Sequence, residues 1–116
     1  MSITVFHILV ALAAQDRHGY SIMRDVAERT DGQIKLSPGT LYGAIRRLLE
    51  EGLIAELDER PDPLHDDERR RYYRLTATGY AAAGRESERL YRLLGQARAN
   101  GLIPEINPAL KPGGAQ

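Results

Sequence analysis

Residues 37–54 read SPGTLYGAIRRLLEEGLI and contain one complete amphipathic helix, followed by the start of a strand. Ser37 can accept a hydrogen bond from a free backbone N–H of the first turn, and Pro38 takes the first helical position, where its missing N–H costs nothing. Apolar side chains then recur at the helical spacing i, i+4, i+7 and i+8: Leu41, Ile45, Leu48 and Leu49. Gly52 is a typical helix stop. The stretch therefore predicts a helix with one buried face.

The opposite face of this helix combines small groups, hydrogen-bonding groups and two cations. Its members are Gly39, Thr40, Gly43, Arg46 and Arg47, with Tyr42 at the edge. A face of this kind can approach another molecule closely. We interpret it as the recognition helix of a DNA-binding protein.

Composition limits the class of protein. The chain has 116 residues, of which 42% are hydrophobic, enough for one globular domain with its own core. It has no cysteine, which excludes disulfides, thiolate zinc sites and cysteine nucleophiles and fits a reducing compartment. No apolar run approaches the roughly 20 residues needed to span a bilayer. We expect a cytoplasmic protein without a membrane segment.

The charge of the chain is balanced overall but uneven along the sequence. Sixteen basic and sixteen acidic residues cancel, which argues against the strongly basic domain of many nucleic-acid binders. However, residues 35–47 contain three cations and no acid, and residues 69–74 contain four arginines. A phosphate group would meet these local fields rather than the net charge.

The elements before and after this helix predict a winged helix-turn-helix. Residues 3–14 form a helix that is apolar on nearly every side, so it must be covered both by its own core and by a partner subunit. A turn at residues 16–19 leads to a second helix, built on Ile22, Met23, Val26 and Ala27, that ends near Asp31 and Gly32. A strand over residues 53–60, a polar loop over 61–68 and a returning strand over 69–76 then form a hairpin. Three helices and a hairpin in this order are typical of a winged helix.

A long fourth helix follows, which Thr76 or Thr78 can cap and Gly101 can end. Apolar and small residues step along it by three and four, as in a coiled-coil seam: Tyr80, Ala83, Ser87, Leu90, Leu94 and Ala97. At about 1.5 Å per residue this helix is about 35 Å long, too long for so small a domain to cover. We expect it to pair with a second copy, together with Phe6 and Leu9 of the first helix.

The predicted fold class is therefore mainly α with a small β-hairpin (α+β), a winged helix-turn-helix followed by a long C-terminal dimerisation helix. The expected organisation is a DNA-binding domain over residues 1–76, the dimerisation helix over 77–101 and an irregular tail over 102–116.

Several motifs of the chain resemble the PadR family of transcriptional regulators. They are His18-Gly19-Tyr20, Ser37-Pro38-Gly39-Thr40-Leu41-Tyr42, Arg47-Leu48, Glu51-Gly52-Leu53-Ile54, Arg70-Arg71-Tyr72-Tyr73-Arg74-Leu75-Thr76 and Gly79. The resemblance implies a homodimeric winged helix-turn-helix protein, usually a repressor, whose last helix pairs with the partner. It also implies that a small aromatic molecule can act as effector.

The chain departs from the family pattern at two positions. Gly43 stands where the family commonly has proline, and Leu49 where it often has glutamate. Glycine inside a helix costs about 1 kcal/mol relative to alanine, so the fold should survive while closer approach to DNA becomes possible. The chain also lacks tryptophan, the flat platform that some drug-sensing relatives place at the dimer centre.

The predicted DNA contacts lie on the third helix and on the wing. They are Ser37, Gly39, Thr40, Tyr42, Gly43, Arg46, Arg47, Arg70 and Arg74. Three alternatives stay open at this point. Tyr42 can be a core residue, Arg47 can pair with an acid, and Asp66, Asp67 and Glu68 can neutralise the wing arginines.

Enzymatic functions find little support in the sequence. None of His7, His18 and His65 stands beside a plausible nucleophile at a readable spacing, and no phosphate-binding loop or metal-ligand pattern occurs. We expect no cofactor and no metal. The favoured function is a sequence-specific DNA-binding repressor that binds a pseudo-palindromic operator as a homodimer and is released by a small-molecule ligand. The alternative is a winged-helix module that binds proteins rather than DNA, which the neutral charge also fits.

Overall fold

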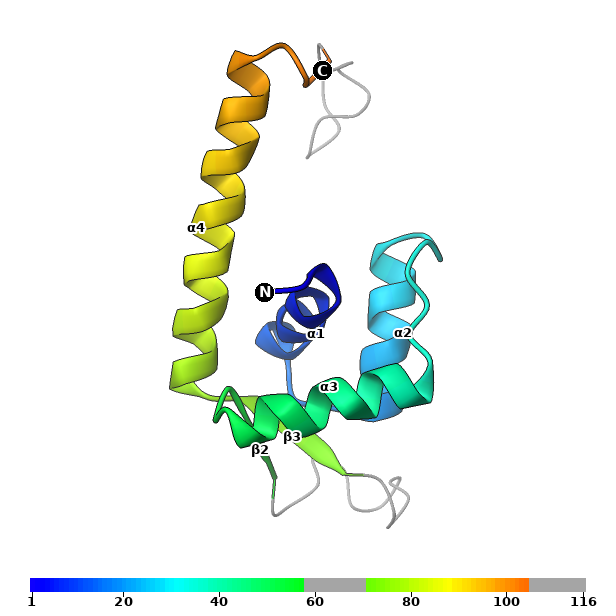
Figure 1. Cartoon of the computed structure of the whole chain (residues 1–116). Coiled ribbons are helices and arrows are strands. Elements are labelled where there is room, and N and C mark those ends of the chain that lie inside the picture. Colours follow the sequence, from blue (N-terminus) through cyan, green and yellow to red (C-terminus); the bar gives the residue numbers. More distant parts are fainter. Residues whose placement is uncertain (58–70, 105–116) are drawn as a thin grey trace. The chain divides into compact units, whose positions relative to one another are not determined.

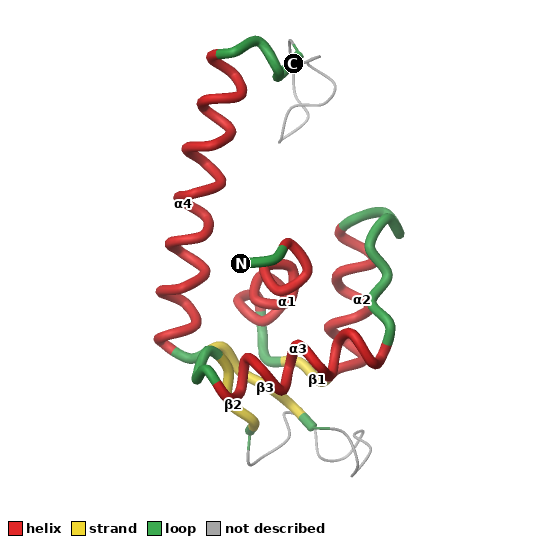
Figure 2. Tube along the Cα trace, in the orientation of Figure 1, coloured by secondary structure: helices red, strands yellow, loops and turns green. Residues whose placement is uncertain are grey.

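The computed structural model describes residues 1–57 and 71–104, and the chain forms two compact units, Met1–Glu86 and Ser87–Gln116. Figure 1 follows the chain through its helices and strands, which Figure 2 separates by colour. In chain order they are α1 (Ile3–Ala14), β1 (Arg17–His18), α2 (Gly19–Arg29), α3 (Pro38–Glu50), β2 (Ile54–Glu56), β3 (Tyr72–Leu75) and α4 (Ala77–Ala99). This order confirms the predicted winged helix-turn-helix with a long final helix.

The local signals that start and stop the helices act as predicted. Ser37 Oγ accepts from the backbone N–H of Thr40 at 3.1 Å, and Pro38 is the first residue of α3. Gly52 follows α3 with a φ of 74°, a left-handed conformation that favours glycine. Gly101 has a φ of 77° and follows α4 in the same way.

The core of the first unit lies where the first three helices meet the sheet. Its fully buried large side chains come from α1, α2 and α3: Ile8, Leu9, Leu12, Ile22, Val26 and Leu41. The predicted stripe on α3 is buried at Leu41, Ile45 and Leu48 and half-buried at Leu49. Ala44 joins it, so the sequence pattern gives the buried face of this helix almost completely.

The small sheet has one strand more than the predicted hairpin. β3 lies in the middle of an antiparallel sheet with β1 on one side and β2 on the other. Arg17 pairs with Tyr73 and His18 with Tyr72. The prediction of a simple turn at residues 16–19 was therefore wrong. A two-residue strand is too short to show an alternating pattern, and its partner lies far along the chain.

The two predicted hairpin strands can be compared with the structure only where their residues are described. β2 covers Ile54–Glu56 and β3 covers Tyr72–Leu75, although the backbone N–H of Leu57 still donates to the carbonyl of Tyr72 at 2.9 Å. Leu53, Leu57, Arg71 and Thr76, at the ends of the predicted strands, are not in strands. Residues 58–70, which include the polar loop and the remaining parts of both predicted strands, lie outside the described residues.

The start of α4 is fixed to the end of α3. Thr76 caps α4: its hydroxyl accepts from the N–H of Gly79 at 3.0 Å and donates to the carbonyl of Gly52 at 2.6 Å. Gly79 is buried directly against the backbone, because a Cβ there would lie 3.0 Å from the carbonyl carbon of Leu53 and 2.7 Å from Leu75 Cδ1. The compact unit consequently runs past residue 76 to Glu86.

The packing of the core corrects one residue of the predicted dimer interface, Leu9. Leu9 has no exposed surface, because it belongs to the core of its own protomer. Phe6 is only half-buried and keeps surface for a partner, whereas Ala83 packs partly against the core. The choice between the faces of α1 could not be made from a helix that is apolar all round.

Candidate nucleic-acid interface

The face of α3 that we interpret as a recognition surface is open to solvent. Gly39, Thr40, Arg46 and Arg47 are exposed, and Gly43 is half-buried. Neither arginine forms an ion pair within residues 1–57 and 71–104. Two guanidinium groups that pair with no described acid therefore lie on the same helix as the small residues of its first two turns.

The hydroxyl groups at the start of α3 leave one donor free. Ser37 Oγ accepts from the backbone of Thr40 and donates to Thr40 Oγ1 at 3.0 Å. Since a hydroxyl has only one proton, that of Ser37 is engaged and that of Thr40 stays available. The backbone N–H of Gly39 belongs to the first turn, where intrahelical acceptors are lacking. Thr40 and Gly39 thus offer adjacent donors, while Ser37 serves mainly as the cap.

Tyr42 connects the recognition surface to the start of α2. It is 46% exposed, and its ring lies over Gly19, where a Cβ would come within 2.8 Å of Tyr42 Cζ. Glycine at position 19 is what leaves room for this ring. Tyr42 is therefore an exposed residue that packs against α2 rather than a core residue, and its contact with DNA stays a prediction.

The two glycines on the exposed face of α3 are not required by the packing of the protomer. A Cβ on Gly39 or Gly43 would meet no other atom within 4 Å. Any reason for glycine at these positions must therefore lie in contacts with another molecule or in backbone freedom.

Arg47 lies at the rim of a surface cavity on the far half of α3. The cavity has a volume of about 290 Å³ and lies between the start of α1 and the end of α3. Its lining is mostly apolar, with Arg47 and Glu51 as the charged members: Met1, Ser2, Val5, Ala44, Arg47, Leu48, Glu51 and Leu53. The ion pair considered for Arg47 is not seen with any described residue.

The described wing arginines are already partly neutralised. Arg74 Nη2 lies 3.1 Å from Asp16 Oδ2, and Arg71 Nη1 lies 3.7 Å from Glu56 Oε1. The acids that contact them come from outside the wing loop, because Asp16 precedes β1 and Glu56 ends β2. Arg70 and the acids at 66–68 lie outside the described residues.

Between these arginines the aromatic residues of β3 split between core and surface. Tyr73 is buried, and Tyr72 is half-buried with its ring edge-on to His18 at 5.1 Å. Burial, with a smaller contribution from Glu56, raises the pKa of the Tyr73 phenol above its ordinary 10.0. Tyr73 thus stays neutral and is a core residue rather than a DNA contact.

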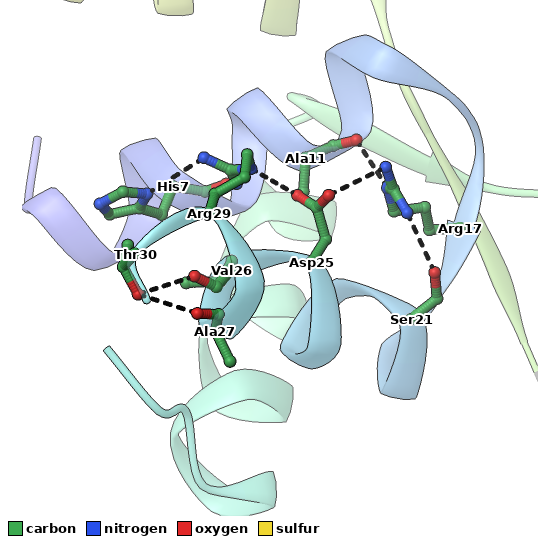
Figure 3. A network of polar contacts seen from close by, with 9 residues as sticks. All are labelled: His7, Ala11, Arg17, Ser21, Asp25, Val26, Ala27, Arg29 and Thr30. Carbon is green, nitrogen blue, oxygen red and sulfur yellow. Dashed lines mark hydrogen bonds and ion pairs between the residues drawn. The ribbon is translucent and has the colours of Figure 1, made fainter. Parts of the chain in front are cut away.

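A polar network that the sequence did not reveal joins α1, β1 and α2 (Figure 3). Asp25 lies at its centre, 3.2 Å from Arg17 Nη2 and 2.6 Å from Arg29 Nε. Arg17 also donates to the carbonyl of Ala11 at 2.9 Å, and Arg29 donates to the carbonyl of His7 at 3.0 Å. The network therefore holds α1 to α2 on either side of β1. The i, i+4 spacing of Asp25 and Arg29 was the one signal available in the sequence.

His7 and His18 have structural partners, and His65 lies outside the described residues. His18 caps α2, since its Nδ1 accepts from the backbone N–H of Ser21 at 3.2 Å, and His7 Nδ1 lies 3.4 Å from Arg29 Nη1. Over residues 1–57 and 71–104, no cluster of three potential metal ligands occurs. Within the same ranges, no helix is both long enough and apolar enough to cross a membrane.

Comparison with known proteins places this geometry in one family. The sequence profile of the PadR-like family of transcriptional regulators matches residues 8–85. A PadR family transcription regulator from Clostridium difficile has a similar structure, with 25% identity and a TM-score of 0.71 over 88% of this chain and 100% of that one. A transcriptional regulator from Clostridium thermocellum has 27% identity and a TM-score of 0.68 over 86% and 92% of the two chains.

A protein of unknown function from Lysinibacillus sphaericus is 31% identical over 64% of this chain. The match spans 65% of that relative, slightly less than two thirds of its length. The family profile, by contrast, covers α2, α3, all three strands and the start of α4. The chain belongs to the PadR-like family of transcriptional regulators.

Proposed function

We propose that this protein is a homodimeric repressor that reads a pseudo-palindromic operator by placing α3 in the major groove. The observation that carries the proposal is the exposed surface of α3, where free donors on Gly39 and Thr40 in the first turn are followed two turns later by Arg46, which pairs with no described acid. In comparable docking geometries the N-terminal end of the recognition helix meets base edges and phosphates. A dimer of such units should bind half-sites about one helical turn apart.

The predicted contact residues divide by role. Thr40 and the backbone of Gly39 are suited to donate to a phosphate, while Arg46 can reach a phosphate or a guanine edge. Ser37 supports them through the cap, and Tyr42 borders the contact. Arg47 also lines the cavity and Arg74 also pairs with Asp16, so we expect both to contribute less to DNA affinity. Arg70 remains a proposed wing contact.

A dimer through α4 is supported by the apolar surface of the second unit. Tyr91, Leu93 and Leu94 are 80%, 52% and 56% exposed. Burying such residues against a second copy removes apolar area from water, at about 25 cal/mol per Å². Sedimentation over a range of protein concentrations should show a dimer. A monomer at all concentrations at which DNA is bound would contradict this part of the proposal.

The test of DNA binding is a titration with fragments of the protein's own upstream DNA at two salt concentrations, with competitor DNA present. We expect binding that resists competitor and weakens as salt rises, because phosphate contacts release counterions. Reporter transcription with and without the protein then gives the sign of regulation. If substitutions of Arg46 and Arg70 leave the DNA affinity unchanged, the result would favour the protein-interaction module instead.

Replacement of Arg46 by glutamine should weaken operator binding about tenfold, since a lost phosphate or guanine contact costs about 1–3 kcal/mol. The measurement is fluorescence anisotropy with a labelled operator fragment. Arg85→Gln is the matched control, because Arg85 is an exposed arginine on α4 without an ion pair to any described residue. Equal affinities of the two variants would argue against Arg46 as a contact.

Gly43→Ala should separate stability from binding. Because a Cβ at this position meets nothing in the protomer, alanine should raise the free energy of unfolding by about 0.5–1 kcal/mol. If α3 approaches DNA closely at Gly43, the same methyl group should lower operator affinity severalfold. Urea denaturation and anisotropy on one preparation test both effects. Unchanged or tighter DNA binding would refute close approach at this residue.

Release by a small molecule is the last part of the proposal, and the cavity beside Arg47 supports it. A ligand acts only if it binds the DNA-free conformation more tightly than the DNA-bound one. An effector should therefore weaken operator binding in proportion to that difference, and DNA should weaken effector binding by the same factor. Equal effector affinity with and without saturating DNA would exclude it as an inducer.

A further inference from the structure

The start of α2 carries an exposed aromatic and cationic pair, Tyr20 and Arg24. Tyr20 is 54% exposed, and the guanidinium carbon of Arg24 lies 5.6 Å from the centroid of its ring, within the range of a cation–π contact. Glu28, four residues further along the same helix, forms no ion pair with Arg24. The arginine is thus held back over the tyrosine, and its charge is not neutralised by an acid of the described chain.

This pair lies next to the recognition surface. Gly19, the residue before Tyr20, is the one over which the Tyr42 ring of α3 packs. Figure 1 shows the first turn of α2 beside α3, and both belong to the same compact unit. The exposed surface of α3 therefore continues through Tyr42 to Tyr20 and Arg24.

The charge of this continuous surface has one sign. Residues 18–24 and 33–49 contain no Asp or Glu, whereas they contribute Arg24, Lys35, Arg46 and Arg47. Of the acids near these segments, Asp16 pairs with Arg74, and Asp25 pairs with two arginines of the polar network. Asp31 and Glu50, which border residues 33–49, form no ion pair with these four cations. An anionic partner would meet cations that no described acid screens by direct pairing.

We infer that Tyr20 and Arg24 form a second DNA-backbone site, which clamps a phosphate flanking the groove that α3 enters. This inference rests on the proposed function of α3. A guanidinium stacked on an aromatic ring keeps its in-plane N–H donors free, and those donors match the oxygens of a phosphate. The tyrosine orients the arginine and reduces the side-chain freedom lost on binding. A backbone contact of this kind fixes the register of α3 and carries no base preference of its own.

The test compares Arg24→Gln with wild type on an operator fragment and on unrelated DNA over several salt concentrations. Loss of one phosphate contact should weaken binding to both DNAs by a similar factor of about five to ten, and should reduce the salt slope by about one. The preference for operator over unrelated DNA should stay the same. Arg85→Gln serves as the control and should match wild type in affinity and slope.

Two substitutions at Tyr20 test the orienting role. Tyr20→Phe keeps the ring and should bind as wild type, whereas Tyr20→Ala should approach the affinity of Arg24→Gln. Wild-type affinity and salt slope in Arg24→Gln would overturn the inference while leaving the role of α3 intact. A wild-type protein without measurable DNA affinity would instead overturn the proposed function, and this inference with it.

Discussion

Replacing Gly79 by alanine should lower the free energy of unfolding by about 3 kcal/mol, the upper part of the range for overpacked cores. A methyl group at this position would press on the carbonyl of Leu53, which already accepts a hydrogen bond from the backbone N–H of Thr76 at 3.1 Å. Leu75 Cδ1, 2.7 Å away, blocks the remaining space. Backbone cannot move aside as a side chain can, so the start of α4 must lift from the sheet.

The matched control for this variant is Gly84→Ala. Gly84 is in the same helix and the same compact unit, but a Cβ there meets nothing within 4 Å. Alanine at this site should raise the free energy of unfolding by about 0.5–1 kcal/mol. Both variants are compared with wild type by urea denaturation at one fixed protein concentration, because dimerisation makes apparent stability concentration-dependent. A Gly79→Ala midpoint at or above that of wild type would refute the tight packing described for Gly79.

Asp25→Ala should also destabilise the fold strongly, by about 2–3 kcal/mol. Removing one partner of a buried ion pair costs about 3–5 kcal/mol, and the lower figure reflects the partial solvent access of this network. The side chains of Arg17 and Asp25 are 14% and 18% exposed. Without the carboxylate, two guanidinium groups face each other across the junction of α1 and α2, with only neutral acceptors left to them.

Glu28→Ala is the comparison for this second variant, since Glu28 is an exposed acid on the same helix. A surface substitution of this kind usually changes stability by less than about 0.5 kcal/mol. Chemical denaturation of the two variants, followed by circular dichroism, gives the difference directly. An equal and small effect of both substitutions would mean that the network adds nothing beyond ordinary surface charge pairs.

Much of the fold could be predicted from sequence because its determinants are local. The cap at Ser37, the stop at Gly52 and the cap at Thr76 each depend on residues within a few positions, and all are confirmed. The buried stripe of α3 follows from helical spacing in the same way. For the recognition surface, the sequence predicts which side chains share the exposed face, while their contact with DNA stays a prediction.

The features that were missed or wrong depend on residues far apart in the chain. β1 exists only because Arg17 and His18 meet β3, and nothing in a two-residue segment reveals that partner. Asp25 and Arg17 are of types usually exposed, so a shared buried site could not be expected from either alone. Leu9 was assigned to the wrong surface because an all-apolar helix gives no indication of which face meets its own core.

The third strand has a consequence for the exchange of parts between relatives. β3, the returning strand of the wing, is hydrogen-bonded on one edge to β2 and on the other to Arg17 and His18, and its Arg74 is tied to Asp16. A wing transplanted from another regulator would lose the strand pairing on one edge of β3 unless the short segment between α1 and α2 came with it. The unit that can be exchanged is therefore the whole three-stranded sheet rather than a continuous stretch of the chain. A chimaera should take β1, β2 and β3 from the same parent.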